Sequence, residues 1–187
     1  MRGIVGVTGS PGTGKKSISP LVAAALGLKC LAINDLARKC GALGRGGREV
    51  DVELLRDRIG REVNGPALLF GHLIPYVLDP RSVRKVVILR CDPGVLKTRL
   101  ARRGYSARKL RENVEAELIG VVSADAYSAF GPNCFEFDTT RTTPGGAAER
   151  VVRLLQKARP APRVDWTLGY DSAKLRWLLS AASSPLT

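Results

Sequence analysis

The chain has 187 residues, and its 44% hydrophobic content is enough for one compact domain with a buried core but not for two large domains. No stretch approaches the roughly 20 uninterrupted apolar residues of a membrane-spanning helix, so we expect a soluble, cytoplasmic protein without a membrane partner. The 30 basic and 17 acidic residues give a formal charge of +13, which favours nucleic acid as a partner, although a solvated basic surface would give the same surplus.

The amino end carries the most informative motif. An apolar run at residues 4–7 is followed at residues 9–15 by GSPGTGK, the pattern of a phosphate-binding loop. Its glycines let successive backbone N–H groups turn toward phosphate oxygens, while Lys15 reaches the β and γ groups. A helix predicted over residues 17–26 adds the positive end of its dipole to this anion site. The motif therefore predicts that the chain binds a nucleoside triphosphate.

Five apolar, β-branched runs alternate with segments of helical character. The runs lie at residues 4–7, 30–33, 67–70, 86–89 and 134–137. They are continuously apolar, as in strands that are covered on both faces. We therefore predict an α/β three-layer sandwich, in which helices flank a five-stranded parallel sheet and phosphate sites lie at the carboxyl ends of the strands.

Further helices are predicted where apolar positions recur at three- and four-residue spacing. They span residues 51–63, 93–103, 107–130 and 144–158, and residues 171–182 could form a last amphipathic helix. The Gly- and Arg-rich stretch 40–48 predicts a mobile, cationic loop. The sequence RPAPR ends the helix after residue 158, so we divide the chain into a domain at residues 1–159 and a tail at residues 160–187, frayed at 183–187.

Four further blocks accompany the loop: INDLAR at residues 33–38, FGH at 70–72, LARRGY at 100–105 and KLRENVEAE at 109–117. Together with GSPGTGKKS, they resemble the archaeal and eukaryotic adenylate kinase family that includes the nuclear adenylate kinase and ribosome-assembly ATPase. The resemblance covers residues 1–157. It implies a P-loop nucleoside monophosphate (NMP) kinase fold with a short NMP-binding segment at about residues 32–50 and a lid at about residues 96–107.

The same resemblance implies a function and its partners. The expected enzyme is a broad-specificity NMP kinase that transfers the γ-phosphate of ATP to AMP or another NMP and has ATPase activity. A role in maturation of the small ribosomal subunit is also implied, beside a platform ribosomal protein and ribosomal RNA. By matching positions, ATP would be held by Gly12, Gly14, Lys15, Lys16 and Ser17, with Arg103 closing over it, and the NMP would lie against Asp35 and Arg38.

Transfer between nucleotides needs no protein base, because the acceptor phosphate has a second pKa of about 6 and is largely anionic at pH 7. The protein must instead align two charged groups and neutralise the transferred one. We expect Lys15 and three arginines to do this. The arginines are Arg99, Arg102 and Arg103, which lie at i, i+3 and i+4 and can project from one side of a helix just before Gly104. A solvated basic helix face is the alternative for all three arginines.

His72 is the only histidine and follows the third predicted strand, at the sheet edge where phosphates are expected. In the resembled family an acidic residue two places earlier serves the magnesium shell, and the histidine is associated with attack by water. Phe70 takes the place of that acid here. His72 is therefore a candidate catalytic residue, with a structural role as the alternative. Asp35 and Asp92 are expected to cap helices.

The sequence lacks two groups that usually help to hold magnesium beside the γ-phosphate, a hydroxyl and a carboxylate. Lys16 stands where a loop Ser or Thr normally ligates magnesium, and Phe70 replaces the carboxylate. The four cysteines form no C-x-x-C pair, so we predict neither a zinc site nor a disulfide framework. We assign no residue of the chain as a metal ligand. One hypothesis is that the Lys16 ammonium partly replaces the magnesium charge. The other is that Mg²⁺ enters bound to ATP with mostly water ligands, an atypical ligation.

The combined prediction is an adenylate or broad-specificity NMP kinase. Two alternatives remain open. The first is an ATP-dependent ribosome-assembly factor with weak or no kinase turnover, which the charge of +13 favours. The second is a P-loop kinase for another small phosphate acceptor.

Overall fold

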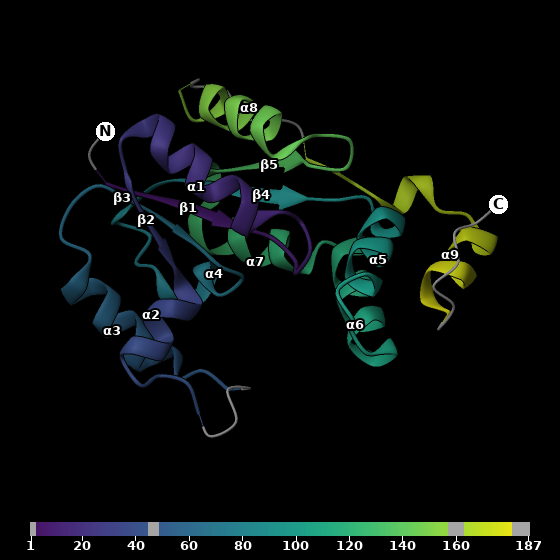
Figure 1. Cartoon of the computed structure of the whole chain (residues 1–187), viewed down its shortest axis with the longest axis horizontal. Helices are drawn as coiled ribbons and strands as arrows, with labels where there is room; N and C mark the ends of the chain where they lie inside the picture. The colour runs from purple at the N-terminus through teal and green to yellow at the C-terminus, as the bar shows by residue number, and fades with distance from the viewer. Residues whose placement is uncertain (1–2, 45–48, 157–162, 181–187) are drawn as a thin grey trace.

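The computed structural model describes residues 3–44, 49–156 and 163–180, and its centre is a five-stranded sheet (Figure 1). The strands are β1 (Ile4–Thr8), β2 (Lys29–Ala32), β3 (Ala67–Phe70), β4 (Val83–Arg90) and β5 (Cys134–Asp138). They lie in the order β2-β3-β1-β4-β5, and every neighbouring pair is parallel. The predicted five-stranded parallel sheet is confirmed.

In the described ranges, one to three helices follow each strand. They are α1 (Lys15–Leu26), α2 (Ile33–Lys39), α3 (Val52–Glu62), α4 (Ile74–Val77), α5 (Pro93–Ala101), α6 (Ala107–Leu118), α7 (Val121–Phe130), α8 (Pro144–Gln156) and α9 (Ser172–Leu179), with 3₁₀ turns η1 (Gly131–Asn133) and η2 (Thr167–Gly169). In this part of the chain no helix combines the length and the apolar character that crossing a membrane demands.

Helices cover both faces of the sheet. Successive residues of a strand point to opposite faces, so they pack in different clusters. Val5 and Val7 pack on one face against α1 and α8. Ile4 and Val86 pack on the other face against α2, α3, α4 and α7. The predicted three-layer sandwich is therefore confirmed, and α5 and α6 extend beyond the carboxyl ends of β1 and β4 (Figure 1).

Two predicted boundaries are wrong. The single helix expected over residues 107–130 is two helices, because Gly120 adopts a left-handed conformation with a φ of 71° between α6 and α7. Ile33, expected at the end of a strand, is the first residue of α2 and is buried beneath it. The loop tip at 45–48, residues 157–158 and the end at 183–187 lie outside the described residues.

Helix caps explain where three helices begin. Asp51, Asp92 and Asp171 each accept a hydrogen bond from a backbone N–H in the first turn of α3, α5 and α9. The capping role predicted for Asp92 is confirmed. The one predicted for Asp35 is wrong, because α2 begins two residues before it and its carboxylate pairs with Arg38 at 3.1 Å.

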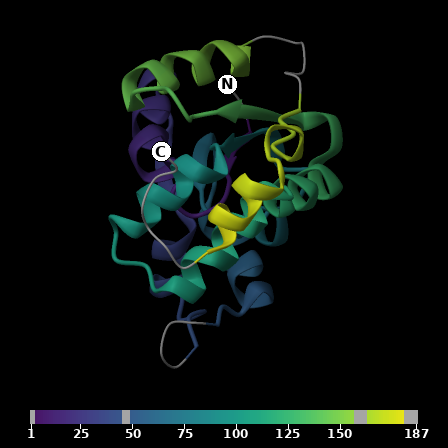
Figure 2. The same cartoon turned by 90° about the vertical axis from the view of Figure 1, so that its right-hand side faces the viewer.

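The described part of the tail packs on α5 and α6. Figure 2 shows α9, in yellow, lying across these two helices, in teal. Leu178 is fully buried in a cluster with Leu96, Leu100 and Val114, and Trp166 and Tyr170 pack against the same cluster. Residues 163–180 therefore complete a hydrophobic core at the carboxyl end of the sheet.

Replacing Leu178 by Ala should lower the free energy of unfolding by about 2 to 5 kcal/mol, because a fully buried side chain leaves a cavity when it is truncated. Chemical denaturation measures this change. The matched control is Leu168→Ala, since Leu168 is 88% exposed and its truncation should cost less than about 0.5 kcal/mol. Equal losses in the two variants would contradict the packing of the tail.

Candidate active site

The loop between β1 and α1 has the shape of a phosphate-binding loop, and two of its positions require glycine. Gly9 has a φ of +136°, and a Cβ there would lie 2.3 Å from the carbonyl oxygen of Leu89. Gly12 has a φ of +93°, and its Cβ would lie 2.6 Å from a methyl group of Leu96. A side chain at either position would push the loop away from β4 or α5.

Lys15 is the first residue of α1 and bends back over this loop. Its Nζ donates hydrogen bonds to the carbonyl oxygens of Gly9 at 2.6 Å and Ser10 at 2.9 Å. Burial of the ammonium lowers the pKa of Lys15 to about 8, while the Glu117 carboxylate raises this pKa and the Arg103 guanidinium lowers it. A phosphate in the loop would offer the ammonium a charged partner in place of the two carbonyls.

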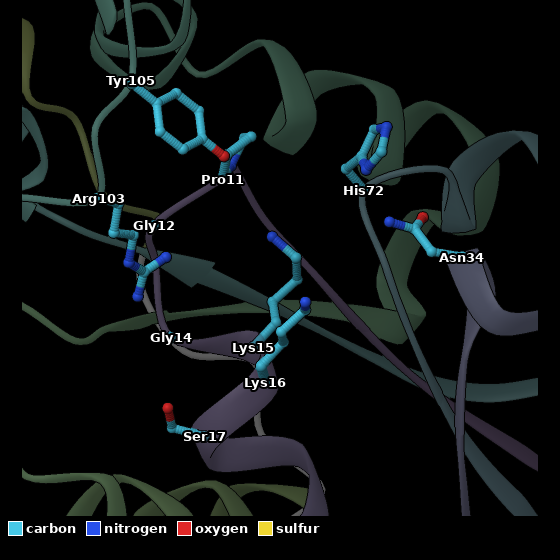
Figure 3. Close-up of a pocket in the computed structure, with 10 residues that line it drawn as sticks. All are labelled: Pro11, Gly12, Gly14, Lys15, Lys16, Ser17, Asn34, His72, Arg103 and Tyr105. Atoms are coloured by element: carbon cyan, nitrogen blue, oxygen red, sulfur yellow. The ribbon is translucent and has the colours of Figure 1, made fainter. Parts of the chain in front are cut away.

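Two adjoining pockets open at the carboxyl ends of the strands. The first, which we call the loop pocket, has a volume of about 530 Å³ and is lined by Pro11, Gly12, Gly14, Lys15, Lys16, Ser17, Asn34, His72, Arg103 and Tyr105 (Figure 3). The second, the side pocket, has a volume of about 360 Å³ and is lined by Lys15, Lys16, Ala32, Asn34, Asp35, Arg38, Phe70, Gly71 and His72. Four residues line both pockets: Lys15, Lys16, Asn34 and His72.

The predicted site residues divide between these pockets. The loop glycines, Ser17 and Arg103 line the loop pocket, and Asp35 and Arg38 line the side pocket. Figure 3 shows the two lysine side chains extending between Arg103 on one side and His72 on the other. Sequence reasoning gave Asn34 and Tyr105 no role in the site, although they lie inside the blocks INDLAR and LARRGY.

Arg99 and Arg103 differ in their contacts. Arg99 donates from Nη2 to the carbonyl oxygens of Thr139 at 3.0 Å and Thr140 at 3.2 Å, so it fastens the segment after β5 to α5. Arg103 is exposed and lines the loop pocket. Between the two, Arg102 is exposed and lines neither the loop pocket nor the side pocket.

His72 lies at the junction of the two pockets. Burial of the ring lowers the pKa of His72, and the nearby Lys15 ammonium lowers it further. The imidazole is therefore neutral at pH 7 and can accept a hydrogen bond from a water or a substrate hydroxyl.

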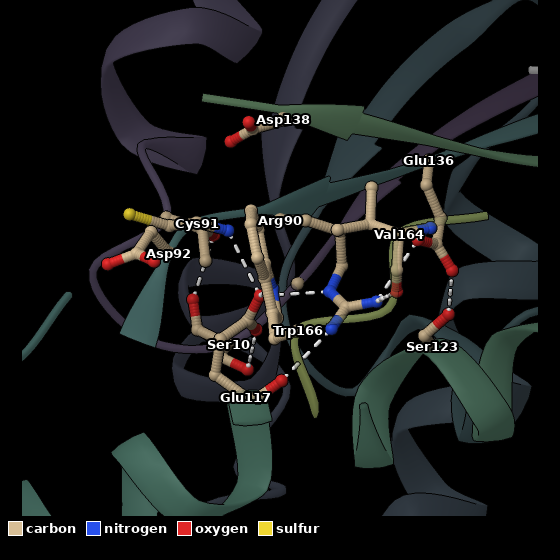
Figure 4. A network of polar contacts seen from close by, with 12 residues as sticks. Ser10, Arg90, Cys91, Asp92, Glu117, Ser123, Glu136, Asp138, Val164 and Trp166 are labelled. Atoms are coloured by element: carbon tan, nitrogen blue, oxygen red, sulfur yellow. Dashed lines mark hydrogen bonds and ion pairs between the residues drawn. The ribbon is translucent and has the colours of Figure 1, made fainter. Parts of the chain in front are cut away.

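A buried charge network supports the loop from below (Figure 4). Arg90, at the end of β4, is 3% exposed and lies between two carboxylates. Its Nε donates to Glu117 Oε1 at 2.9 Å, and its Nη1 donates to Glu136 Oε2 at 3.0 Å. Glu136 also accepts from the Ser123 hydroxyl and, at 2.6 Å, from the backbone N–H of Val164.

Glu117 joins this network to the loop and to the tail. It accepts from the Ser10 hydroxyl at 2.6 Å, from the Cys91 N–H at 3.0 Å and from the Trp166 indole at 3.2 Å. Sequence reasoning missed Glu117, although a signal was present. A charged residue falls on the apolar face of α6, between Val114 and Leu118.

The pockets do not offer a protein site for a divalent cation. Within the described ranges, no group of three or more His, Cys, Asp or Glu residues could hold a metal ion. The loop pocket is lined by no carboxylate, and the only one in the side pocket, Asp35, is paired with Arg38. The lysines and Arg103 that line the loop pocket are cations, and its side-chain oxygens are the uncharged ones of Ser17, Asn34 and Tyr105, so the lining offers Mg²⁺ no anionic ligand.

Comparison with known proteins identifies relatives along most of the chain. A family model described as an AAA domain matches residues 5–120. A Thermococcus kodakarensis protein named "Putative adenylate kinase" is 36% identical over 173 residues, which cover 90% of this chain and 95% of the relative. A Methanothermobacter thermautotrophicus protein of the same name is 34% identical, covering 87% of this chain and 98% of the relative. These relatives confirm the archaeal adenylate kinase resemblance.

Solved structures with the same fold are also found. A shikimate kinase from Bacteroides thetaiotaomicron has a TM-score of 0.59 at 18% identity, covering 84% of this chain and all of that one (100%). A Bacillus subtilis protein, YorR, solved with phosphorylated GDP, has a TM-score of 0.58 at 16% identity and covers 82% of this chain and 95% of its own. At such identities the likeness establishes the fold alone.

The pKa of Lys15 predicts how the affinity for ATP depends on pH. With a pKa of about 8 in the free protein, Lys15 loses its proton as the pH rises through 8, while bound phosphate favours the protonated form. The affinity for ATP should therefore be level up to about pH 7.5 and fall up to tenfold per pH unit above about pH 8. Calorimetry between pH 7.5 and 9.5 measures this.

The control is Lys15→Met, which should bind ATP weakly and without this pH dependence. Proton uptake should accompany binding at pH 8.5 to the native chain and disappear in the variant. An affinity of the native chain that stays level up to pH 9.5 would contradict the role of the Lys15 ammonium.

Proposed function

Since this chain belongs to the AAA-domain family and to the family of the archaeal adenylate kinase relatives, we propose that it is an adenylate or broad-specificity NMP kinase with ATPase activity. Family and fold together support nucleotide kinase activity. One observation carries the finer proposal: two pockets, each large enough for part of a nucleotide, meet at Lys15, Lys16 and His72. A donor and an acceptor phosphate can face each other there.

ATP is assigned to the loop pocket and the NMP to the side pocket. An anionic oxygen of the acceptor phosphate attacks the γ-phosphorus, the bond from that phosphorus to the β-bridging oxygen breaks, and ADP leaves. Lys15 moves from the loop carbonyls to the β- and γ-phosphates, and Arg103 neutralises charge on the transferred group. Arg38, on the acceptor side, can exchange Asp35 for the acceptor phosphate.

Two further residues have supporting roles. Arg99 is occupied by two backbone carbonyls, so we assign it a positioning role in place of the direct phosphate contact expected from the sequence. His72, neutral at pH 7, is assigned to holding a water near the γ-phosphate when the side pocket is empty, which would account for ATPase activity. P-loop kinases usually take ATP with Mg²⁺; a metal ion that enters with ATP would be held here by the triphosphate and water, an atypical ligation that leaves the charge of Lys16 free to act on phosphate.

A coupled assay of ADP formation tests the proposed kinase. AMP should raise ADP formation above the rate of ATP hydrolysis alone. Arg103→Ala should lower kcat by about 10²- to 10³-fold, because it removes a charge that acts on the transferred group. Arg102→Ala is the matched control, as it removes a neighbouring exposed arginine outside both pockets and should leave kcat unchanged.

ATP hydrolysis that AMP does not affect would contradict the kinase and favour the ribosome-assembly ATPase. Stimulation by a different small acceptor, and not by any NMP, would favour a P-loop kinase of the kind represented by the shikimate kinase. A screen of NMPs and non-nucleotide alcohols separates these outcomes.

A second proposed role is participation in small-subunit maturation, in contact with ribosomal RNA and a platform ribosomal protein. The charge of +13 favours it. The chain should co-sediment with small ribosomal subunits at low salt and dissociate at high salt or on addition of ATP. A chain that stays in the supernatant at low salt would contradict this role. A cytoplasmic location remains a prediction.

A further inference from the structure

Lys16 stands at the P-loop position that usually carries a Ser or Thr. It is the second residue of α1, is exposed, and lines both the loop pocket and the side pocket. In Figure 3 its side chain extends alongside that of Lys15, between Arg103 and His72. The Lys15 ammonium binds two loop carbonyls, whereas within the described part of the chain no hydrogen bond or ion pair holds the Lys16 ammonium.

The surroundings of Lys16 leave its charge without a protein anion. Phe70, at the end of β3, lines the side pocket where the resembled family has a carboxylate. Asp35 is taken up by Arg38, and Glu117 lies beneath the loop in the Arg90 network. An ammonium with free donors in a pocket of this kind favours phosphate oxygens as partners.

The usual P-loop places a magnesium ion at this point, held in part by the Ser or Thr after the lysine. Here that hydroxyl is replaced by a cation, and the pocket lining offers no carboxylate to attract a second one. The Lys16 ammonium and a magnesium ion bound at this point would repel each other. The residues present therefore suit a phosphate group held directly by lysines better than one held through a protein-bound metal.

We propose that Lys16 is a catalytic residue that contacts the γ-phosphate and supplies the positive charge for which other P-loop kinases use a protein-held magnesium ion. This inference rests on the proposed kinase function. The transfer step stays balanced, because Lys16 keeps its proton: the acceptor oxygen bonds to the γ-phosphorus, and the bond to the β-bridging oxygen breaks. The consequence is an affinity for metal-free ATP that depends on Lys16.

Calorimetric titration of the full chain with ATP, in EDTA and in excess Mg²⁺, tests the inference without any phosphoryl transfer. For the native chain the two affinities should agree within about threefold. Lys16→Thr restores the usual P-loop residue and should weaken binding of metal-free ATP by about tenfold or more, the effect of losing one charge-assisted hydrogen bond. The double variant Lys16→Thr with Phe70→Asp should bind ATP at least about tenfold tighter with Mg²⁺ than in EDTA.

Lys29→Thr is the matched control, because Lys29 is exposed at the opposite, amino end of β2. It should bind metal-free ATP like the native chain. Thermal unfolding of each variant checks that Lys16→Thr, an exposed substitution, leaves the fold intact.

The inference is overturned if the native chain binds ATP in EDTA no better than Lys16→Thr does, or if both respond to Mg²⁺ equally. Because no acceptor is present in this titration, such a failure is distinct from failure of the AMP-stimulated assay, which tests the kinase function itself.

Discussion

The arrangement of the whole carboxyl edge of the sheet depends on one buried guanidinium. Arg90 lies between Glu117 and Glu136, so two carboxylates share a single cation in a region with almost no access to water. Taking these charges out of water is costly, and their mutual attraction offsets that cost only if the remaining lone pairs are satisfied. Hydrogen bonds from Ser10, Ser123 and the backbone of Val164 satisfy them. Each of these donors is therefore fixed in place.

This network also reaches the loop between β1 and α1. Through Ser10 it holds the phosphate-binding loop, and the charge of Glu117 raises the pKa of Lys15 against the effect of burial. Several hydrogen bonds attach the tail. Besides the bond from Val164 to Glu136, the Trp166 indole donates to Glu117, and Tyr170 donates to Asp92, the cap of α5. Because α5 leads to Arg103, the packing of the tail helps to set the position of this arginine at the loop pocket. Residues of the tail thus belong to the support of the site.

Local pattern was enough to predict the sheet, the loop and most helices, since continuous apolar runs and caps act at short range. It failed where tertiary packing decides. Gly120 gives no signal that separates a helical glycine from a left-handed break. Asp35 is of a residue type that often caps helices, but α2 begins two residues earlier, at the buried Ile33. The network was missed because Arg90 and Glu117 are 27 residues apart, so only the fold brings their charges together.

The two unusual residues of the site, Lys16 and Phe70, fit each other electrostatically. If position 70 carried a carboxylate, it would line the side pocket together with Lys16 and would compete with phosphate for that ammonium. An aromatic ring at this position removes the competition. Glu117, which raises the pKa of Lys15, is buried beneath the loop and is shared with Arg90, so it cannot neutralise the exposed Lys16. A cation at position 16 is thus available to phosphate only if position 70 is uncharged, and this chain has both features.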